Sequence, residues 1–175
     1  MGGMHAHVIL AAGQGTRMRS RLPKVLHPLL GKPMLLYALE AALALKPERL
    51  VVVVGHGGEK VVEALEGYPV EVAWQKEQLG TAHALLQAEG LLRDFPGPFL
   101  VTQGDTPLLS PRTLEALLRR VREGAGMALL TAELPDPTGY GRILREGEEV
   151  LGNVEEKDAP PEVRAIREVN AGAYA

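Results

Sequence analysis

Cysteine is absent from this 175-residue chain. The absence excludes a disulfide framework, a thiol nucleophile and a thiolate metal site, and it fits a reducing compartment, so the expected location is the cytoplasm. Long apolar runs are absent too. No stretch approaches the roughly 20 residues that span a membrane, and the N-terminal segment has no basic leader. We therefore expect no membrane partner.

Acidic side chains are missing from residues 1–39, although the chain has 22 of them in all. This stretch holds five basic residues, Arg17, Arg19, Arg21, Lys24 and Lys32. The net charge is −3 overall, and the other residues, with 14 basic and 22 acidic side chains, carry −8. A short cationic stretch in an acidic chain suits a small anionic ligand better than nucleic acid, which binds a basic face across a domain. We therefore expect no nucleic-acid partner.

Strands and helices are expected to alternate through the first two thirds of the chain. Four runs rich in Val, Ile and Leu are too continuous for strands with one wet face, and they predict buried parallel strands. These runs are residues 8–10, 50–54, 70–74 and 99–102. Helical patterns cover 35–43, 59–65, 81–92 and 114–121, the last after the N-cap and first-turn pair Ser110-Pro111. The alternation predicts a doubly wound, mostly parallel, Rossmann-like α/β sheet.

The pattern changes after residues 127–134. Residues 141–144 and 149–154 flank Gly147 and predict a β-hairpin, a charged connector follows at 158–167, and 168–175 begins like another strand. We interpret residues 1–175 as one domain, with the parallel sheet in 1–110 and a hairpin subregion in 127–175. Ligands of such sheets collect outside the carboxyl ends of the strands, so the loops there matter most.

The first of these loops reads Ala11-Ala12-Gly13-Gln14-Gly15-Thr16-Arg17-Met18 and continues to Pro23-Lys24. The glycines let backbone N–H groups approach phosphate oxygens, and Arg17 and Lys24 can neutralise the charge there. Met18 stands where the dinucleotide motif G-x-G-x-x-G needs glycine, and the P-loop pattern is absent too. A tight turn without a ligand stays the alternative for this G-x-G.

A carboxylate follows the fourth predicted strand, in Gln103-Gly104-Asp105-Thr106-Pro107. Mg²⁺ in proteins uses one or two carboxylates together with substrate phosphates, so Asp105 is the leading metal ligand. The alternative is an Asx turn or a helix cap, the commoner use of an aspartate beside Gly and Pro.

The segment from Gln75 to Thr81 leaves a strand and enters a helix. Its amide side chain and backbone groups can pair with the edge of a pyrimidine. The alternative is that Thr81 caps the helix and Gln75 lies on the surface. His83 can simply face its helix, and His56 can line the pocket, but the five histidines lack the paired spacing of a zinc site.

Seven segments together resemble the N-terminal pyrophosphorylase domain of the bacterial N-acetylglucosamine-1-phosphate uridylyltransferases. They are LAAGQGTRMRSRLPKVLHPLLGKPML, VVVVGHGG, WQKEQLGTAHA, QGDTPLL, DPTGYGRI, VEEKDA and EVNAG, in the order of that family. The resemblance covers nearly the whole chain. It implies a GT-A-like nucleotidyltransferase fold and the formation of UDP-N-acetylglucosamine and pyrophosphate from UTP and N-acetylglucosamine 1-phosphate, with Mg²⁺ as cofactor.

The resemblance also implies a role for each matching position. The nucleotide would be bound by Leu10, Ala11, Ala12, Gly13, Gly15, Lys24, Gln75, Gln78, Gly80, Thr81 and Gly104. The sugar would be bound by Gly141, Glu155 and Asn170, since asparagine offers donor and acceptor together and a buried carboxylate suits paired hydroxyls. Asp105 would coordinate Mg²⁺, while Lys24 and Arg17 would be catalytic. Residues 1–110 would then bind the nucleotide and residues 127–175 the sugar.

The implied reaction is in-line attack of the sugar-phosphate oxygen on the α-phosphorus of UTP, driven by positioning and charge stabilisation. Two departures from the family stand out. Ala171 replaces the threonine expected after Asn170, and the family's domain continues past the position that matches Ala175, where it supplies a second Mg²⁺ ligand. The hexapeptide-repeat half of the family has no counterpart, which predicts no acetyl transfer.

Three questions stay open from the sequence. A related nucleotidyltransferase for another sugar phosphate, or for a cytidylyl or molybdopterin guanylyl product, shares the AAGxGxRM start. A shortened module that binds nucleotide without turnover is the non-catalytic alternative. Copies of the chain can also assemble into a homo-oligomer without any signature in the sequence.

Overall fold

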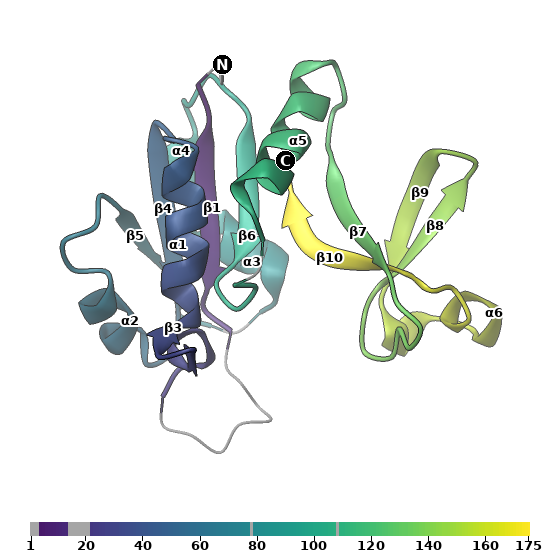
Figure 1. The fold of residues 1–175 in the computed structure, drawn as a ribbon, viewed down its shortest axis with the longest axis horizontal. Coiled ribbons are helices and arrows are strands. Elements are labelled where there is room, and N and C mark those ends of the chain that lie inside the picture. The colour runs from purple at the N-terminus through teal and green to yellow at the C-terminus, as the bar shows by residue number, and fades with distance from the viewer. Residues whose placement is uncertain (1–3, 14–21, 78, 108) are drawn as a thin grey trace.

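The computed structural model describes residues 4–13, 22–77, 79–107 and 109–175. In this part of the chain, the main sheet has eight strands in the order β5-β4-β1-β6-β10-β8-β9, and β7 also pairs with β10 (Figure 1). The first four are parallel: β5 (Glu71–Trp74), β4 (Arg49–Val54), β1 (Ala6–Ala11) and β6 (Phe99–Gln103). The other four pair antiparallel: β7 (Leu129–Glu133), β8 (Arg142–Glu146), β9 (Glu149–Val154) and β10 (Glu168–Tyr174). The predicted α/β class is confirmed.

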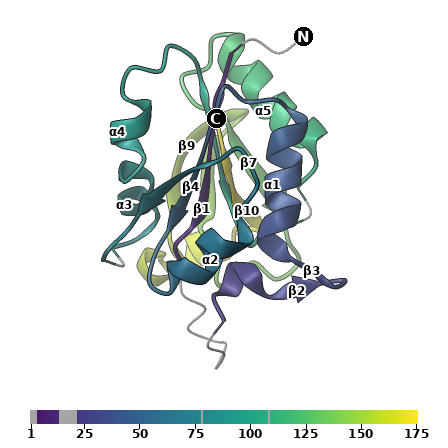
Figure 2. The same cartoon turned by 90° about the vertical axis from the view of Figure 1, so that its left-hand side faces the viewer.

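Each central strand is buried on both faces, which is why its sequence is an unbroken apolar run. In β1, Ile9 and Ala11 pack in one cluster and Val8 and Leu10 in another, on opposite faces of the sheet. The first face is covered by α1 (Met34–Ala44), α2 (Gly58–Ala64) and α5 (Pro111–Arg122), and the second by α3 (Thr81–Leu86) and α4 (Glu89–Leu92) (Figure 2). The sheet is therefore doubly wound, as predicted.

Helix boundaries follow the sequence signals with one exception. The Ser110 side chain accepts a hydrogen bond from the Thr113 N–H at 3.2 Å and caps α5, as expected. The single helix predicted at 81–92 is wrong, because α3 and α4 are separated by a turn. Amide bonds from Ala88 to Leu85 and from Leu91 to Ala88 tighten the chain there, and Gly90 weakens a continuous helix. Among the described helices, none has the length and apolar character to cross a membrane.

The hairpin predicted around Gly147 is present as β8 and β9, and the glycine has a φ of +61°. The expected connector is partly ordered into η2 (Glu156–Asp158) and α6 (Pro161–Arg164). The last strand, β10, joins the lobe that carries the β8–β9 hairpin to the parallel strands of the main body (Figure 1). Val169 of β10 pairs with β7 and β8, whereas Tyr174 pairs with Val101 of β6. Between these ends Gly172 has a φ of +80° and the register shifts, so the strand bends.

Between β1 and α1, the residues that the structure describes form three short elements. They are η1 (Lys24–Leu26), β2 (Pro28–Leu29) and β3 (Lys32–Pro33). The turn joining β2 and β3 holds Leu30 and Gly31 at φ values of +52° and +81°, and the two strands form a small sheet of their own. Val25 and Leu26 of η1 are buried against α1, which anchors Lys24 at the edge of the main sheet.

Candidate active site

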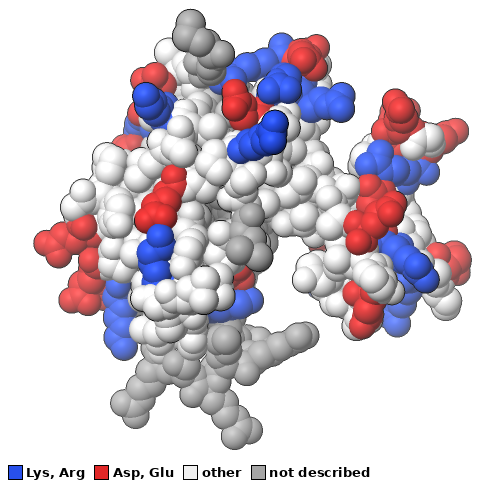
Figure 3. Space-filling view, viewed as in Figure 1, with Lys and Arg blue, Asp and Glu red and all other residues white. Residues whose placement is uncertain are grey.

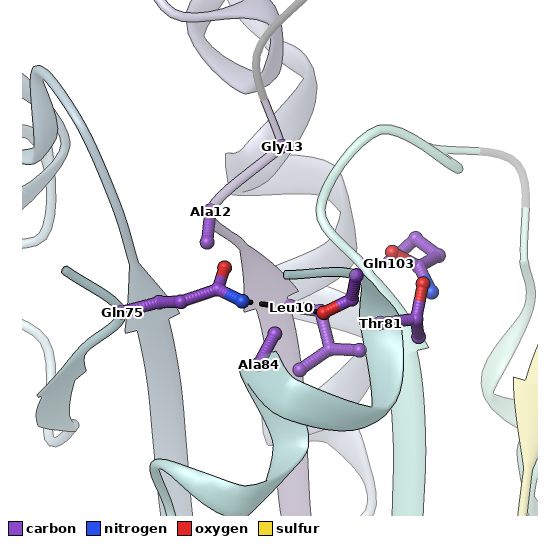
Figure 4. Close-up of a pocket in the computed structure, with 8 residues that line it drawn as sticks. Leu10, Ala12, Gly13, Gln75, Thr81, Ala84 and Gln103 are labelled. Carbon is purple, nitrogen blue, oxygen red and sulfur yellow. Dashed lines mark hydrogen bonds between the residues drawn. The ribbon is translucent and has the colours of Figure 1, made fainter. Parts of the chain in front are cut away.

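A pocket of about 150 Å³ opens at the carboxyl ends of β1 and β6, next to the start of α3 (Figure 4). This is the edge where ligands of open α/β sheets bind. Six of its lining residues are among those expected to bind nucleotide: Leu10, Ala12, Gly13, Gln75, Gly80 and Thr81. The other two are Ala84 and Gln103. The structure thus brings together three loops that are far apart in the sequence.

Gln75 is buried, with 3% of its surface exposed. Its N–H donates to the Val54 carbonyl at 2.7 Å and extends the β4–β5 ladder by one residue. Because side chains alternate along a strand, Gln75 points to the same face as buried Ala73, toward α3. Its side-chain nitrogen donates to the Gly80 carbonyl at 3.2 Å. The alternative that Gln75 is a surface residue is wrong.

Gly80 has a φ of +100° and a ψ of 178°, a region that is essentially restricted to glycine. A Cβ added there would meet nothing within 4 Å, so the requirement for glycine is conformational and not steric. Gly80 is the N-cap of α3, whose first residue is Thr81. The alternative that Thr81 caps this helix is therefore wrong, and its exposed side chain lies at the pocket instead.

Lys24 and Asp105 meet at the same edge of the sheet. Their Nζ and Oδ2 atoms are 2.8 Å apart, and the side chains are 45% and 28% exposed. Gly104 allows this approach, since a Cβ there would come within 3.0 Å of Val25 beside Lys24. Among the described residues, no backbone N–H donates to the Asp105 carboxylate. The cation and the carboxylate expected to face a polyphosphate therefore lie together. They are close to the pocket, because Asp105 is two residues after Gln103, which lines it.

The three residues expected at the sugar lie on or beside the antiparallel strands: Gly141 precedes β8, Glu155 follows β9 and Asn170 is in β10. The Asn170 N–H donates to the Gly141 carbonyl at 3.0 Å. A Cβ on Gly141 would collide with the amide of Asn153, and that amide donates to Glu155 at 3.1 Å. One expectation is wrong: Glu155 is exposed, because it follows β9, which lies at the end of the strand order.

Both ends of the Asn170 amide are engaged. Its Nδ2 donates to the Tyr174 hydroxyl at 2.6 Å, and its Oδ1 accepts from the Gly172 N–H at 2.8 Å. An amide has a second N–H and a second lone pair, which are available to a hydroxyl-bearing ligand. The bend of β10 also brings Gly172 alongside Gln103, because a Cβ added to this glycine would lie 3.4 Å from the Gln103 Cγ. The strand carrying Asn170 therefore passes the pocket.

Sequence reasoning missed Arg142, Tyr174 and Gln103. Arg142 is 3% exposed, and its guanidinium donates to the Tyr140 carbonyl and to Glu156. A hydrogen bond from the Gly139 N–H, together with the Arg142 charge, holds the pKa of Glu156 below its usual range. These bonds fix the loop that carries Gly141. The signal available in the sequence was an arginine inside the segment DPTGYGRI. The structure shows that it is buried, and arginine is almost never buried unpaired.

Several expected residues are placed elsewhere. The side chain of Ala11 packs in the cluster under α1, away from the pocket. His56 is exposed and lines none of the described pocket. Gly15, Arg17 and Gln78 lie outside the described residues. Within the described ranges, no group of three or more His, Cys, Asp and Glu side chains could hold a metal ion.

A match to a protein-family model identifies the family of this chain. The model of the MobA-like NTP transferase domain matches residues 7–160, which include β1 apart from Ala6, the strands β2 to β9 and both charged residues of the Lys24–Asp105 pair. The chain belongs to this family. The MobA-like domain is therefore a nucleotidyltransferase domain, as the resemblance implied.

Curated relatives confirm the resemblance at the level of individual proteins. The bifunctional protein GlmU of Syntrophotalea carbinolica is 55% identical over 171 residues, which are 97% of this chain and 37% of that protein. The bifunctional protein GlmU of Pelotomaculum thermopropionicum is 54% identical over the same share of this chain. The chain spans a little over a third of the length of these relatives.

Solved structures agree on the fold. A putative glucose-1-phosphate thymidylyltransferase from Bacillus anthracis has a TM-score of 0.81 at 20% identity, covering 97% of this chain and 70% of that one. A UDP-glucose pyrophosphorylase in complex with UDP-glucose also has a TM-score of 0.81, at 23% identity, covering 98% of this chain and 75% of that one. The MobA-like domain thus has the architecture of sugar nucleotidyltransferases.

Proposed function

We propose that this domain catalyses the transfer of UMP from UTP to N-acetylglucosamine 1-phosphate, forming UDP-N-acetylglucosamine and pyrophosphate. The observation that carries the proposal is the Lys24–Asp105 pair, 2.8 Å apart beside the pocket. A cation and a carboxylate at one sheet edge match the two needs of a triphosphate, direct charge neutralisation and a metal ligand. The GlmU relatives support the choice of substrates.

The uracil and its ribose would occupy the pocket. Gln75 offers a buried amide there, and Leu10, Ala12 and Gly13 also line the pocket. The pocket is small compared with the volume of a whole nucleotide, so it fits the base and leaves the phosphates toward Lys24 and Asp105. Gly15, Arg17 and Gln78 remain assigned to the nucleotide as predictions.

Mg²⁺ fits the residues present as a single-carboxylate site. Asp105 is partly exposed, its carboxylate is held by no backbone donor of the described residues, and Lys24 lies against it. Mg²⁺ commonly takes one or two carboxylates and completes its shell with substrate phosphates and water. When bound, the ion would neutralise charge on the phosphate oxygens. Asp105 would hold it, and the ammonium of Lys24 would turn to the phosphates.

The chemistry needs no nucleophilic side chain. A phosphate oxygen of the sugar phosphate bonds to the α-phosphorus of UTP, the bond from that phosphorus to the β-phosphate oxygen breaks, and pyrophosphate leaves with the electron pair. Lys24 stabilises the negative charge that builds up between the entering and leaving oxygens. Gly141, Glu155 and Asn170 would hold the sugar so that its phosphate lies in line.

The test is the release of pyrophosphate from UTP and N-acetylglucosamine 1-phosphate with Mg²⁺. The Syntrophotalea carbinolica relative, 55% identical, serves as the positive control. Product from both proteins supports the proposal. UTP binding without product from this chain supports the non-catalytic alternative. A panel of CTP, GTP and dTTP with other sugar phosphates identifies a different nucleotidyltransferase, since the matched product then exceeds UDP-N-acetylglucosamine. Cytoplasmic location and a homo-oligomer stay predictions.

A further inference from the structure

His83 makes a contact that the proposed mechanism does not use. It lies half-buried on α3, with its ring Nδ1 2.9 Å from the side-chain nitrogen of Gln75. Gln75 lines the pocket assigned above to the nucleobase and is 3% exposed. The orientation of this amide therefore decides whether Gln75 offers a base a hydrogen-bond acceptor or a donor.

The neighbours of the amide fix its orientation. Gln75 Nε2 lies 3.2 Å from the Gly80 carbonyl oxygen, and a carbonyl oxygen can only accept. The NH₂ end must therefore face Gly80, and its second N–H is directed to Nδ1 of His83, which accepts with its lone pair. Figure 4 shows the carbonyl oxygen of Gln75 turned toward Ala12 in the pocket wall. Among the residues that the structure describes, none donates to that oxygen.

This arrangement requires one tautomer of His83. Because Nδ1 accepts, the proton of the neutral ring is on Nε2. The amide nitrogen of Gln87 approaches Nε2 at 3.4 Å, but two donors form no bond, and Gln87 instead donates to the backbone carbonyl of His83 at 2.9 Å. Gln87 therefore does not compete for Nδ1. The Nδ1 lone pair of His83 therefore adds a second acceptor beside the Gly80 carbonyl and favours the same orientation of the Gln75 amide.

We propose that His83 is a positioning residue for base selection. By holding both N–H groups of Gln75 away, together with Gly80, it leaves the pocket with an acceptor oxygen. A pyrimidine with a ring N–H, such as uracil, pairs with this oxygen, whereas cytosine presents a ring nitrogen that is itself an acceptor. The inference rests on the proposed function, because it assumes that the pocket holds the base.

Two substitutions test it through the ratio of the dissociation constants for CTP and UTP, measured with Mg²⁺ by calorimetry. His83→Phe keeps a ring and removes the acceptor, so the preference for UTP should fall about tenfold or more. His83→Asn restores an acceptor oxygen near the position of Nδ1 and should recover most of the preference. A merely structural role predicts no such rescue of selectivity. An unchanged ratio in His83→Phe overturns the proposal.

A measurement on the unmodified chain covers the case in which His83→Phe does not fold. The ¹⁵N and ¹H signals of the His83 ring report which nitrogen carries the proton, and we expect a proton on Nε2 and none on Nδ1. A proton on Nδ1 overturns the proposal. Failure of the proposed function gives a different result, since the unmodified chain would then bind UTP no better than CTP while the ring signals still report the contact to Gln75.

Discussion

The two halves of the molecule are stabilised in different ways. The parallel half, residues 4–110, buries its central strands on both faces, and every residue of β1 is buried. The antiparallel half, residues 127–175, exposes one side of its hairpin and is fastened by ion pairs such as Arg145–Glu168. Figure 3 shows interleaved positive and negative side chains crowded over the hairpin lobe, and wide uncharged areas over the body.

The difference in packing between the two halves suits two different functions. A rigid, fully packed half suits the precise placement of phosphates, where small displacements cost much rate. A half held by surface ion pairs opens locally at lower free energy and suits the admission of a second substrate. Four predictions test this comparison.

Acid should destabilise the parallel half first. Burial, with a smaller effect from nearby His5, lowers the pKa of His7 from 6.5 to about 3. An unfolded histidine takes up a proton near pH 6.5 while the folded one stays neutral. Stability is therefore constant above that pH and falls below it by about 1.4 kcal/mol per unit, about 5 kcal/mol in all by pH 3. Urea unfolding followed by the fluorescence of Trp74 in β5 measures it.

The control for this prediction is His7→Gln, which keeps a hydrogen-bonding group for the Thr102 hydroxyl and cannot titrate. Its stability should be flat between pH 6.5 and 4.5. The ion pairs of the antiparallel half affect stability at lower pH. Arg145 holds the pKa of Glu168 below its usual range. The contribution of this pair to stability is therefore present above about pH 4.5 and is lost as the pH falls further. Equal pH dependence in the unmodified chain and His7→Gln would contradict the assignment.

Lys24→Ala should lower turnover at least roughly a hundredfold, the scale seen when one charge-stabilising donor is removed. The matched control is Lys32→Ala, which removes a partly exposed lysine paired with Glu40 and should leave turnover unchanged. Steady-state pyrophosphate release measures both. If Lys24→Ala retains full turnover, the phosphates do not bind in the parallel half beside Asp105.

Gly80→Ala should cost roughly 1–3 kcal/mol of stability, because alanine is strained at this backbone conformation. It should also weaken UTP binding, since the Gly80 carbonyl accepts from Gln75 in the pocket. Gly67→Ala is the matched control: its φ is +88° with no atom within 4 Å of an added Cβ, and it lies outside the pocket. Equal loss of UTP affinity in both variants would show that strain alone is responsible.

Glu168→Gln should have the smallest effect. The change removes the ion pair to Arg145 and weakens the bond from Thr131, both in the antiparallel half. Amide exchange in β8 and β9 should accelerate by roughly two- to fivefold, the range of a partly exposed pair, while exchange in β1 and β4 stays unchanged. Glu89→Gln, which breaks an exposed pair on α4, should alter neither. Faster exchange in β1 would mean that the two halves open as one unit.

The parallel half could be predicted from the sequence in some detail. Its strands are unbroken runs of Val, Ile and Leu, and the cap at Ser110 is a local signal that acts within one turn. The antiparallel half was predicted only in part. The hairpin around Gly147 is local, but the insertion of β10 beside β6 depends on contacts between residues more than 70 positions apart, such as Tyr174 and Val101.

For the candidate site, the residue types and loops were foreseen and their mutual contacts were not. Lys24 and Asp105 were expected to face one ligand, but their direct pairing depends on how closely Val25 packs on Gly104. The bond between Gln75 and His83 joins the end of a strand to the following helix, and no spacing rule predicts it. Glu155 was expected to be buried because of its expected role at the sugar, but it is exposed. Its exposure depends on which segments cover the outer strand β9, and the local sequence does not determine this.

By itself, the sequence determined the alternation of strands and helices, the edge of the sheet at which the candidate site lies, and the family. These follow from periodicity and from motifs that act over short stretches of chain. Only the tertiary structure decided which way the Gln75 amide points, which charge faces Lys24, and how β10 carries Asn170 past the pocket. Those features depend on packing between distant segments, where a shift of one residue or a turn of one side chain changes the partner.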